Sequence, residues 1–447
     1  MKKKLIVVIT IGSMYLLKSY IAARAQLVTF ILFTIFIYFI EKFLETRKIK
    51  YALGMITISL LVANMHVATW PFLFVLFLPY IAEWITCWIV DDILYQKSLI
   101  LYYKLRIIFL KDILEKKKDI NKEKILSKIK LFDEKIEKVN KRAKKVKEAR
   151  EKEEKYKIVM NKNSNIKWIL LIMIICVLMG FITPIGDTPF TYLYKTMQGN
   201  TTSNINEHLP LTLIKSMPLM CTIIIVLAVL TFTKAKIRLS DLFMISGLTY
   251  LMFSSKRQST MFVLIGGIIL NRLISQLFEI YDICKIKDLT KKYIGKFTAV
   301  VLAGLTIILS LQYLKDVLDD EYVSESSYPV QASEWMLENL DVNNIKLFNQ
   351  YNFGSYLVFK GIPVFIDSRA DLYTPEFNGR DRSIFNDFLN SDNISTYYGN
   401  IFKEYEITHV LIYKGSKIAM LIRNADSEKY EEIYSDDNFV LYKVLSY

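Results

Sequence analysis

The chain has 447 residues, of which 53% are hydrophobic, and its mean hydropathy is +0.27. The apolar residues are gathered in long runs, a composition typical of an integral membrane protein. The net charge of +14 comes largely from residues 111–157 and from short basic runs beside the apolar segments, so it is explained without a nucleic-acid partner. The four cysteines form no C-x-x-C pair, which argues against a disulfide framework or a structural zinc site, and three histidines are too few for a His-rich metal site.

About nine apolar segments could cross the hydrocarbon core of a membrane, which takes about 20 helical residues. The first segment follows Lys2–Lys4 and precedes Ala23-Arg24-Ala25, which resembles a signal-peptide cleavage site. It is therefore either a span or a cleaved signal, and the topology of the other segments is the same in both cases. The sequence predicts an α-helical polytopic membrane domain with spans near residues 5–20, 24–40, 51–66, 70–90, 167–183, 211–233, 239–254, 258–275 and 297–314.

Basic residues in the connecting loops indicate the orientation of these spans. Loops rich in lysine and arginine usually face the cytoplasm. We therefore expect a multi-pass protein of the plasma membrane, with a cytoplasmic N-terminus and an extracytoplasmic C-terminal domain. If the spans alternate, the basic segments that share one side are residues 2–4, 47–50, 104–157, 234–238 and 285–296.

A long polar insertion separates the fourth and fifth spans. Residues 92–162 contain no glycine or proline, which favours a helix. Asp119 and Asn121 interrupt the pattern, so the insertion could fold back on residues 99–114 as an antiparallel hairpin. It is either a solvated helical spacer or an interface for a protein partner or for self-association. The spacing predicts a cytoplasmic coiled coil with its seam at Ile125, Ile129, Phe132, Ile136, Val139, Ala143 and Val146.

The residues after the last span predict a small extracytoplasmic α/β domain. Pro329 opens an amphipathic helix that continues to Leu340, and further helices are expected around residues 380–390 and 416–424. Strands are expected at residues 345–348, 364–367, 409–413 and 439–444. The expected domains are residues 1–91 with four spans, 92–165 with the basic coiled coil, 166–318 with five spans, and 319–447 with the α/β domain.

Polar residues at the ends of the spans gather on the predicted outer side. They come from five separate loops, and ionisable groups at membrane depth usually face a cavity or a partner, so we expect one polar site. Taken singly, each residue could equally be an interfacial anchor or a helix-end charge. The set consists of Arg24, Gln26, Asn64, His66, Pro184, Gly186, Asp187, Glu207, His208, Lys256, Arg257 and Gln258.

The residue types in this set favour phosphate chemistry. The carboxylates of Asp187 and Glu207 could act as a catalytic base or bind a divalent metal such as Mg²⁺ or Mn²⁺, and no other cofactor is indicated. The cations suited to a phosphate or pyrophosphate are Arg24, His66, Lys256 and Arg257.

Five short motifs carry a family resemblance. Together they resemble a group of bacterial membrane proteins that is similar to the GT-C superfamily of membrane glycosyltransferases. The motifs are Ala23-Arg24-Ala25-Gln26-Leu27, Asn64-Met65-His66, Pro184-Ile185-Gly186, Glu207-His208-Leu209-Pro210 and Ser255-Lys256-Arg257.

The most distinctive part of the resemblance lies in residues 347–357 and 364–373. The first stretch also resembles the Trp-Trp-Asp-Tyr-Gly region of the oligosaccharyltransferase catalytic subunit, although Asn352 replaces its acidic residue. Asp367 and Arg369 could bind an acceptor, or they could form an internal ion pair while Gly354 allows close packing. The outer-domain candidates are Asn352, Gly354, Asp367, Arg369 and Asp371.

The resemblance implies transfer of a sugar from a polyprenyl-phosphate donor on the outer face of the membrane. It implies that the four cations hold the donor lipid, with Asp187 as the best available carboxylate to activate the acceptor. GT-C enzymes carry their catalytic carboxylate in a first outer loop, and this chain lacks that span and loop. The chain is therefore a shortened form, or Asp187 or Glu207 has a different role, or the protein is not an active transferase.

Two other functions are compatible with these features. A non-catalytic membrane scaffold or lipid-glycan binding protein would keep the basic site and recruit partners through the coiled coil. A transporter or flippase would need charges near the middle of the membrane, and the predicted spans are nearly free of them.

Overall fold

The computed structural model describes residues 2–17, 25–116, 122–152, 157–199, 201–212, 216–281, 296–319 and 323–447. The chain divides into two compact units. The first unit comprises Met1–Tyr192 and Glu207–Lys287, and the second comprises Leu193–Asn206 and Asp288–Tyr447.

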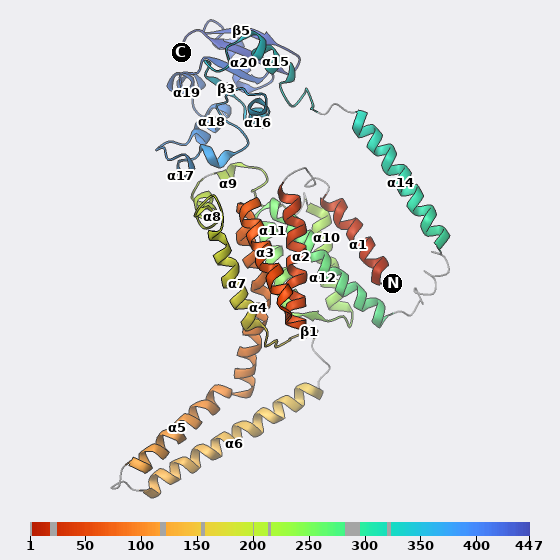
Figure 1. Cartoon of the computed structure of the whole chain (residues 1–447), viewed down its shortest axis with the longest axis vertical. Coiled ribbons are helices and arrows are strands. Elements are labelled where there is room, and N and C mark those ends of the chain that lie inside the picture. Colours follow the sequence, from red (N-terminus) through yellow and green to blue (C-terminus); the bar gives the residue numbers. More distant parts are fainter. Residues whose placement is uncertain are drawn as a thin grey trace. The chain divides into compact units, whose positions relative to one another are not determined.

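The first unit is a helical bundle with a helical hairpin attached to it (Figure 1). Short 3-10 turns, η2 (Val67–Thr69), η3 (Met179–Phe181) and η5 (Lys256–Gln258), join or extend its helices. The two-residue strands β1 (Ile158–Val159) and β2 (Ile237–Arg238) pair in parallel. The bundle helices are α1 (Lys2–Leu17), α2 (Ala25–Thr46), α3 (Ile49–Met65), α4 (Trp70–Tyr95), α7 (Ile166–Leu178), α10 (Met217–Phe232), α11 (Leu239–Ser254) and α12 (Ser259–Ile280), and α8 (Thr188–Gln198) follows α7.

Three helical segments are long and apolar enough to cross a membrane: Gln26–Thr46, Val67–Val90 and Lys256–Ile280. They coincide with the spans expected near residues 24–40, 70–90 and 258–275, and they indicate membrane association. Several other expected spans are shorter apolar helices, so the number nine stays a prediction. These shorter helices are Ile49–Met65, Ile166–Phe181, Leu219–Phe232, Leu239–Ser254 and Ala303–Gln312.

Aromatic rings and small polar groups hold the bundle together. Phe36 of α2 meets Phe77 of α4 edge to face, with ring centroids 5.2 Å apart. The buried Ser59 of α3 accepts a hydrogen bond from the indole of Trp70 at 3.0 Å and donates one to the carbonyl oxygen of Cys176 at 2.9 Å. These bonds satisfy polar groups that lie far from water and connect α3, α4 and α7.

The polar insertion forms an antiparallel hairpin of α5 (Lys97–Lys116) and α6 (Lys122–Lys152) (Figure 1). Tyr103 of α5 stacks on Phe132 of α6 at a centroid distance of 5.5 Å. The expected seam residues of α6 are buried or half-buried, whereas most residues between them are exposed. Coiled-coil geometry itself stays a prediction, and Asp119 and Asn121 lie outside the described residues.

The second unit contains a four-stranded sheet in the order β3-β4-β6-β5. The strands β3 (Leu347–Asn349) and β4 (His409–Tyr413) are parallel, whereas β6 (Phe439–Val444) is antiparallel to both β4 and β5 (Tyr430–Ser435). The accompanying helices are α14 (Lys296–Asp319), α15 (Val330–Asn339), α16 (Tyr351–Phe359), α17 (Pro375–Asn378), α18 (Ile384–Asp392), α19 (Tyr398–Glu404) and α20 (Lys417–Ala425).

Alternation along the strands gives the sheet two apolar faces. Val410 and Ile412 of β4 belong to a core that contains Phe348 and Phe402. Leu411, between them, belongs to a second core with Met336, Phe353 and Phe439. Both faces are therefore covered by helices or loops, as an α/β domain requires.

The strand expected at residues 364–367 is wrong. The backbone of this segment is bound by a side chain instead of a neighbouring strand, since Asn349 accepts from the Phe365 amide at 2.9 Å and donates to the Ile366 carbonyl oxygen at 2.8 Å. The sequence analysis also missed β5, α16 and α19. It predicted β4 and β6 at their observed positions.

A loop from the middle of the chain completes the second unit. Residues 193–206, which include α9 (Thr201–Asn204), belong to it. The buried Thr201 donates to an Asp371 carboxylate oxygen at 2.9 Å, and Ile205 packs against the core around Phe348. The C-terminal domain therefore depends on chain that precedes α10.

Candidate functional site

The structure brings several expected outer residues together at one end of the bundle. His66 lies between α3 and η2, where its backbone leaves the helical conformation with φ −152° and ψ 70°. Its Nδ1 atom is 2.8 Å from the Thr29 hydroxyl oxygen of α2. The imidazole is thereby fixed beside the start of α2 and is half-buried.

The basic pair Lys256–Arg257 lies on η5, in the tight corner between α11 and α12. The amide of Arg257 donates to the Glu207 carbonyl oxygen at 3.0 Å, and the amide of Lys256 donates to the Leu209 carbonyl oxygen at the same distance. The Ser255 hydroxyl also donates to the Glu207 carbonyl oxygen at 3.3 Å. The motifs at 207–209 and 255–257 therefore form one backbone-paired corner.

Burial and, to a smaller extent, repulsion from the positive charge of Arg257 lower the pKa of His66, so the two side chains do not attract each other. Within the described parts of the chain, no carboxylate forms an ion pair with Arg257. We define His66, Lys256, Arg257 and Glu207 as the outer-end cluster, which consists of two half-buried cations, a half-buried imidazole and one exposed acidic residue.

Asp187 does not join the outer-end cluster. It precedes α8, where its carbonyl oxygen accepts from the amides of Phe190 at 2.9 Å and Thr191 at 3.1 Å. Its side chain is exposed, and no contact with the cluster is found among the described residues. The role predicted for Asp187 stays a prediction, and Arg24 lies outside the described residues.

The predicted divalent metal has no evident ligand set in the described regions. No group of three or more His, Cys, Asp or Glu side chains within them is arranged to hold a metal ion.

In the second unit, Asp367 and Arg369 form the ion pair considered from the sequence. Arg369 donates from Nη2 to Asp367 at 2.5 Å and from its amide at 2.8 Å. Burial opposes ionisation of Asp367, but these bonds from Arg369 outweigh it, and the pKa of Asp367 lies below its usual range. Burial and the adjacent Asp367 carboxylate raise the pKa of Tyr373 to about 12.

Gly354 is required by close packing. A Cβ atom at this position would lie 2.0 Å from the Ile366 carbonyl oxygen and 2.9 Å from the Asn349 amide nitrogen. Asn352, on the same helix, is exposed, and Asp371 is occupied by Thr201. These contacts give Gly354, Asp367, Arg369 and Asp371 a structural role. Asn352, the fifth outer-domain candidate, is exposed and has no such contact among the described residues.

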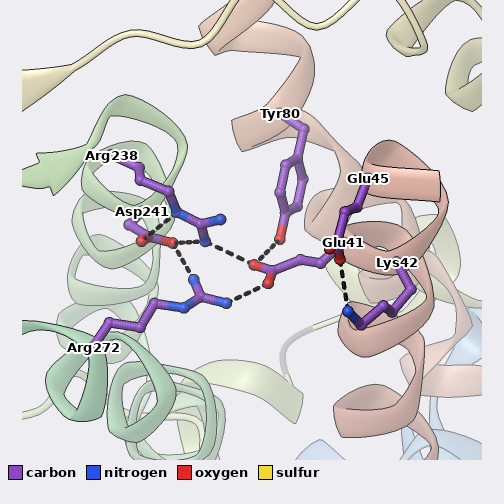
Figure 2. A network of polar contacts seen from close by, with 7 residues as sticks. All are labelled: Glu41, Lys42, Glu45, Tyr80, Arg238, Asp241 and Arg272. Carbon is purple, nitrogen blue, oxygen red and sulfur yellow. Dashed lines mark hydrogen bonds and ion pairs between the residues drawn. The ribbon is translucent and has the colours of Figure 1, made fainter. Parts of the chain in front are cut away.

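Charged side chains also meet at the opposite ends of α2, α11 and α12, where Figure 2 shows them facing one another. Arg238 donates to Glu41 at 2.7 Å and to both carboxylate oxygens of Asp241 at 2.7 and 2.8 Å. Arg272 donates to the same two carboxylates at 2.5 and 2.6 Å. We define these four residues as the inner-end network, and Tyr80 adds a bond to Glu41 at 3.2 Å.

Two cavities adjoin the inner-end network. One of about 360 Å³ is lined by Lys236, Arg238, Asp241, Asn271 and Arg272, among others. Another of about 280 Å³ is lined by Glu41, Tyr80, Glu83 and Arg238, among others, and there Glu83 accepts a hydrogen bond from the Asn161 amide at 3.0 Å. Because each arginine already bridges both carboxylates, the network neutralises itself and fixes three helices to one another.

The inner-end network was not predicted from the sequence. Arg238 is predicted only as part of a cytoplasmic basic loop, and no role is predicted for Glu41 or Arg272. The available signal was an acidic and a basic residue placed within otherwise apolar helices, because such charges need partners at membrane depth.

Comparison of the chain with models of protein families and with curated proteins gives no match.

Proposed function

We propose that the chain is a multi-pass membrane protein that binds the phosphate group of a polyprenyl-linked sugar at its outer-end cluster and acts as a GT-C-like glycosyltransferase. The observation that carries this proposal is the positive charge of Arg257, with which no carboxylate among the described residues forms an ion pair. A guanidinium without a carboxylate partner is suited to bidentate binding of a phosphate. Helix corners place both residues at an end of the bundle, where a lipid headgroup would arrive.

The chain segments that form the second unit support the proposed topology. Residues 193–206 precede α10, and they pack in the same compact unit as the C-terminal sheet. Both segments must therefore face the same side of a membrane. The basic loops favour the outer side for both, as a transferase using an external lipid-linked donor requires.

The proposed reaction is displacement at the sugar. A carboxylate removes the proton from an acceptor hydroxyl, the acceptor oxygen bonds to the anomeric carbon, and the bond from that carbon to the phosphate oxygen breaks. Polyprenyl phosphate leaves with the electron pair and stays bound by Arg257 and Lys256. Of the two candidate bases, Glu207 is favoured, because its backbone is bonded to Arg257.

Binding of undecaprenyl phosphate to the full chain in lipid nanodiscs tests the first half of the proposal. Arg257→Ala is expected to weaken binding about tenfold or more, because a hydrogen bond to a charged group contributes about 1.5–3 kcal/mol. Lys48→Ala is the matched control, since Lys48 is an exposed cation between α2 and α3 at their other ends. Equal binding by wild type and Arg257→Ala would reject the site.

Sugar transfer in membranes tests the second half. Glu207→Gln is expected to retain lipid binding and to abolish transfer, with Asp187→Gln as the comparison. The separation of Asp187 from the cluster favours one alternative, a non-catalytic lipid-glycan binding protein. That alternative is supported if the wild-type chain binds the lipid through Arg257 but transfers no sugar from any polyprenyl-phosphate donor offered.

A further inference from the structure

The hairpin helix α5 has two apolar faces, and α6 covers only one of them. Ile107, on the face toward α6, is 8% exposed. On the opposite face Leu101, Leu105, Ile108 and Phe109 are between 57% and 63% exposed. Their spacing of four, three and one residues puts them on one side of the helix. We call these four residues the outer face of α5.

Cations border the outer face. Lys97, Lys104, Arg106 and Lys111 are all exposed, and no acidic residue occurs between the first and the last of them. Arg106 is held beside the face, because its Nε donates to the Tyr102 hydroxyl oxygen at 3.2 Å. Asp112 ends this stretch near the C-terminal end of α5. An apolar stripe with cationic edges is the pattern of a helix that lies on an anionic membrane surface.

The position of α5 in the chain also puts its start near the membrane surface. The membrane-length segment Val67–Val90 ends five residues before the end of α4, which corresponds to about 8 Å of helix. The single residue Gln96 then turns the chain in a left-handed conformation with φ +49°. Trp88, 58% exposed near the same end of α4, is a typical residue of the membrane interface.

We propose that the outer face of α5 binds the surface of an anionic lipid leaflet. Leu101, Leu105, Ile108 and Phe109 enter the boundary between headgroups and acyl chains, and the bordering lysine and arginine side chains extend to lipid phosphates. A second copy of the hairpin is a poorer occupant, because it would bring identical cationic edges together. This inference is independent of the chemistry at the outer-end cluster.

The test uses the full chain with its four cysteines replaced by serine, held as one copy per nanodisc. An environment-sensitive fluorophore is attached at Leu105→Cys, and a control fluorophore at Lys130→Cys on the exposed side of α6. Nanodiscs contain phosphatidylcholine alone or mixed with phosphatidylglycerol, with and without brominated acyl chains. The label at position 105 is expected to shift to shorter wavelength and to be quenched by brominated lipid when phosphatidylglycerol is present, and the label at position 130 is expected to do neither.

A charge variant separates lipid attraction from simple burial. Lys104→Gln combined with Lys111→Gln is expected to raise the phosphatidylglycerol fraction that gives half of the spectral shift. The proposal is overturned if the label at position 105 stays in water in every single-copy nanodisc. It is equally overturned if that label becomes buried only when several copies share a vesicle, since a second copy would then be the occupant.

Discussion

The two ends of the helical bundle treat charge in opposite ways. At the inner-end network, two arginines and two carboxylates bridge one another, with every separation between 2.5 and 2.8 Å. At the outer-end cluster, the amide of Arg257 donates to the Glu207 carbonyl oxygen, and no carboxylate of the described chain forms an ion pair with its guanidinium. The helices α2, α11 and α12 run between the two ends, since Thr29 of α2 is bonded to His66 and η5 joins α11 to α12, whereas Glu41, Asp241 and Arg272 lie on the helices themselves.

This difference separates charges that hold a fold from charges that can hold a ligand. A buried ion pair is stable only while all its members are present, because removing one leaves another charge without a partner. A cation without a carboxylate keeps its charge for an anion that arrives later. The inner-end network is therefore a helix clasp, and the outer-end cluster is the candidate site.

The largest expected effect is an all-or-none difference in labelling that shows on which side of the membrane each end of the bundle lies. In a cysteine-free background, cysteine at the exposed position Arg380 should react with a membrane-impermeant maleimide in intact cells, and cysteine at the exposed position Lys141 should not. Both should react after the membrane is made permeable. The reverse labelling in intact cells would exchange the inner and outer ends.

Removal of one carboxylate from the clasp should have the next largest effect. Asp241→Asn leaves Arg238 and Arg272 with one carboxylate between them, and it is expected to lower the free energy of unfolding by about 3–5 kcal/mol. The measurement is denaturant unfolding of the detergent-solubilised chain. Glu45→Gln is the matched control, since Glu45 is 63% exposed and its ion pair within the described chain is with Lys42, a contact shown in Figure 2. Equal stability of the two variants would contradict the assignment of a clasp.

The Asp367–Arg369 pair is the reference for an arginine–carboxylate bond outside the apolar helices. Because the pKa of Asp367 is lowered in the folded state, its contribution is complete above the ordinary value of about 3.9. The contribution is lost as the pH falls through the lowered pKa. Asp367→Asn is expected to cost about 1 kcal/mol at pH 7, since Arg369 is 61% exposed, and to weaken the acid dependence. An unchanged acid titration of unfolding would rule this pair out as its source.

The smallest effect on stability is expected for substitution of Arg257. Arg257→Gln should change the free energy of unfolding by no more than about 0.5 kcal/mol, because no carboxylate of the described residues loses a partner. The same unfolding assay as for Asp241→Asn gives a direct contrast. Destabilisation as large as that of Asp241→Asn would mean that Arg257 is structural, and the phosphate site would lose its main support.

The sheet shows which strands a sequence reveals. The nearly continuous apolar runs His409–Tyr413 and Phe439–Val444 predict both strands at their observed limits, because each strand has two apolar faces. The edge strand β5 was missed, since Glu431 and Glu432 are exposed there and give it a polar pattern. Residues 364–366 are apolar enough to suggest a strand, but the Asn349 side chain forms hydrogen bonds with the backbone of Phe365 and Ile366. No local sequence pattern predicts that contact.

The polar sites show a similar limit. The sequence indicates that His66 and Arg257 lie at the ends of apolar helices. The cost of burying charge indicates that such residues need a polar partner or a ligand. It does not indicate which helices are neighbours. Glu41 and Arg272 are 231 residues apart, so their pairing becomes visible only once α2 and α12 are placed in one bundle.

The loop that completes the C-terminal domain has a consequence for biosynthesis. Residues 193–206 leave the ribosome before α10, α11 and α12 are made, and the strand β6 follows more than 200 residues later. At about 5–20 residues per second, the loop waits on the order of ten seconds or longer for the sheet that receives it. Throughout that interval Thr201 and Ile205 lack their final partners. The domain therefore completes its fold only after the intervening helices have been synthesised, and a fragment that begins at residue 323 would lack residues 193–206, which belong to the domain.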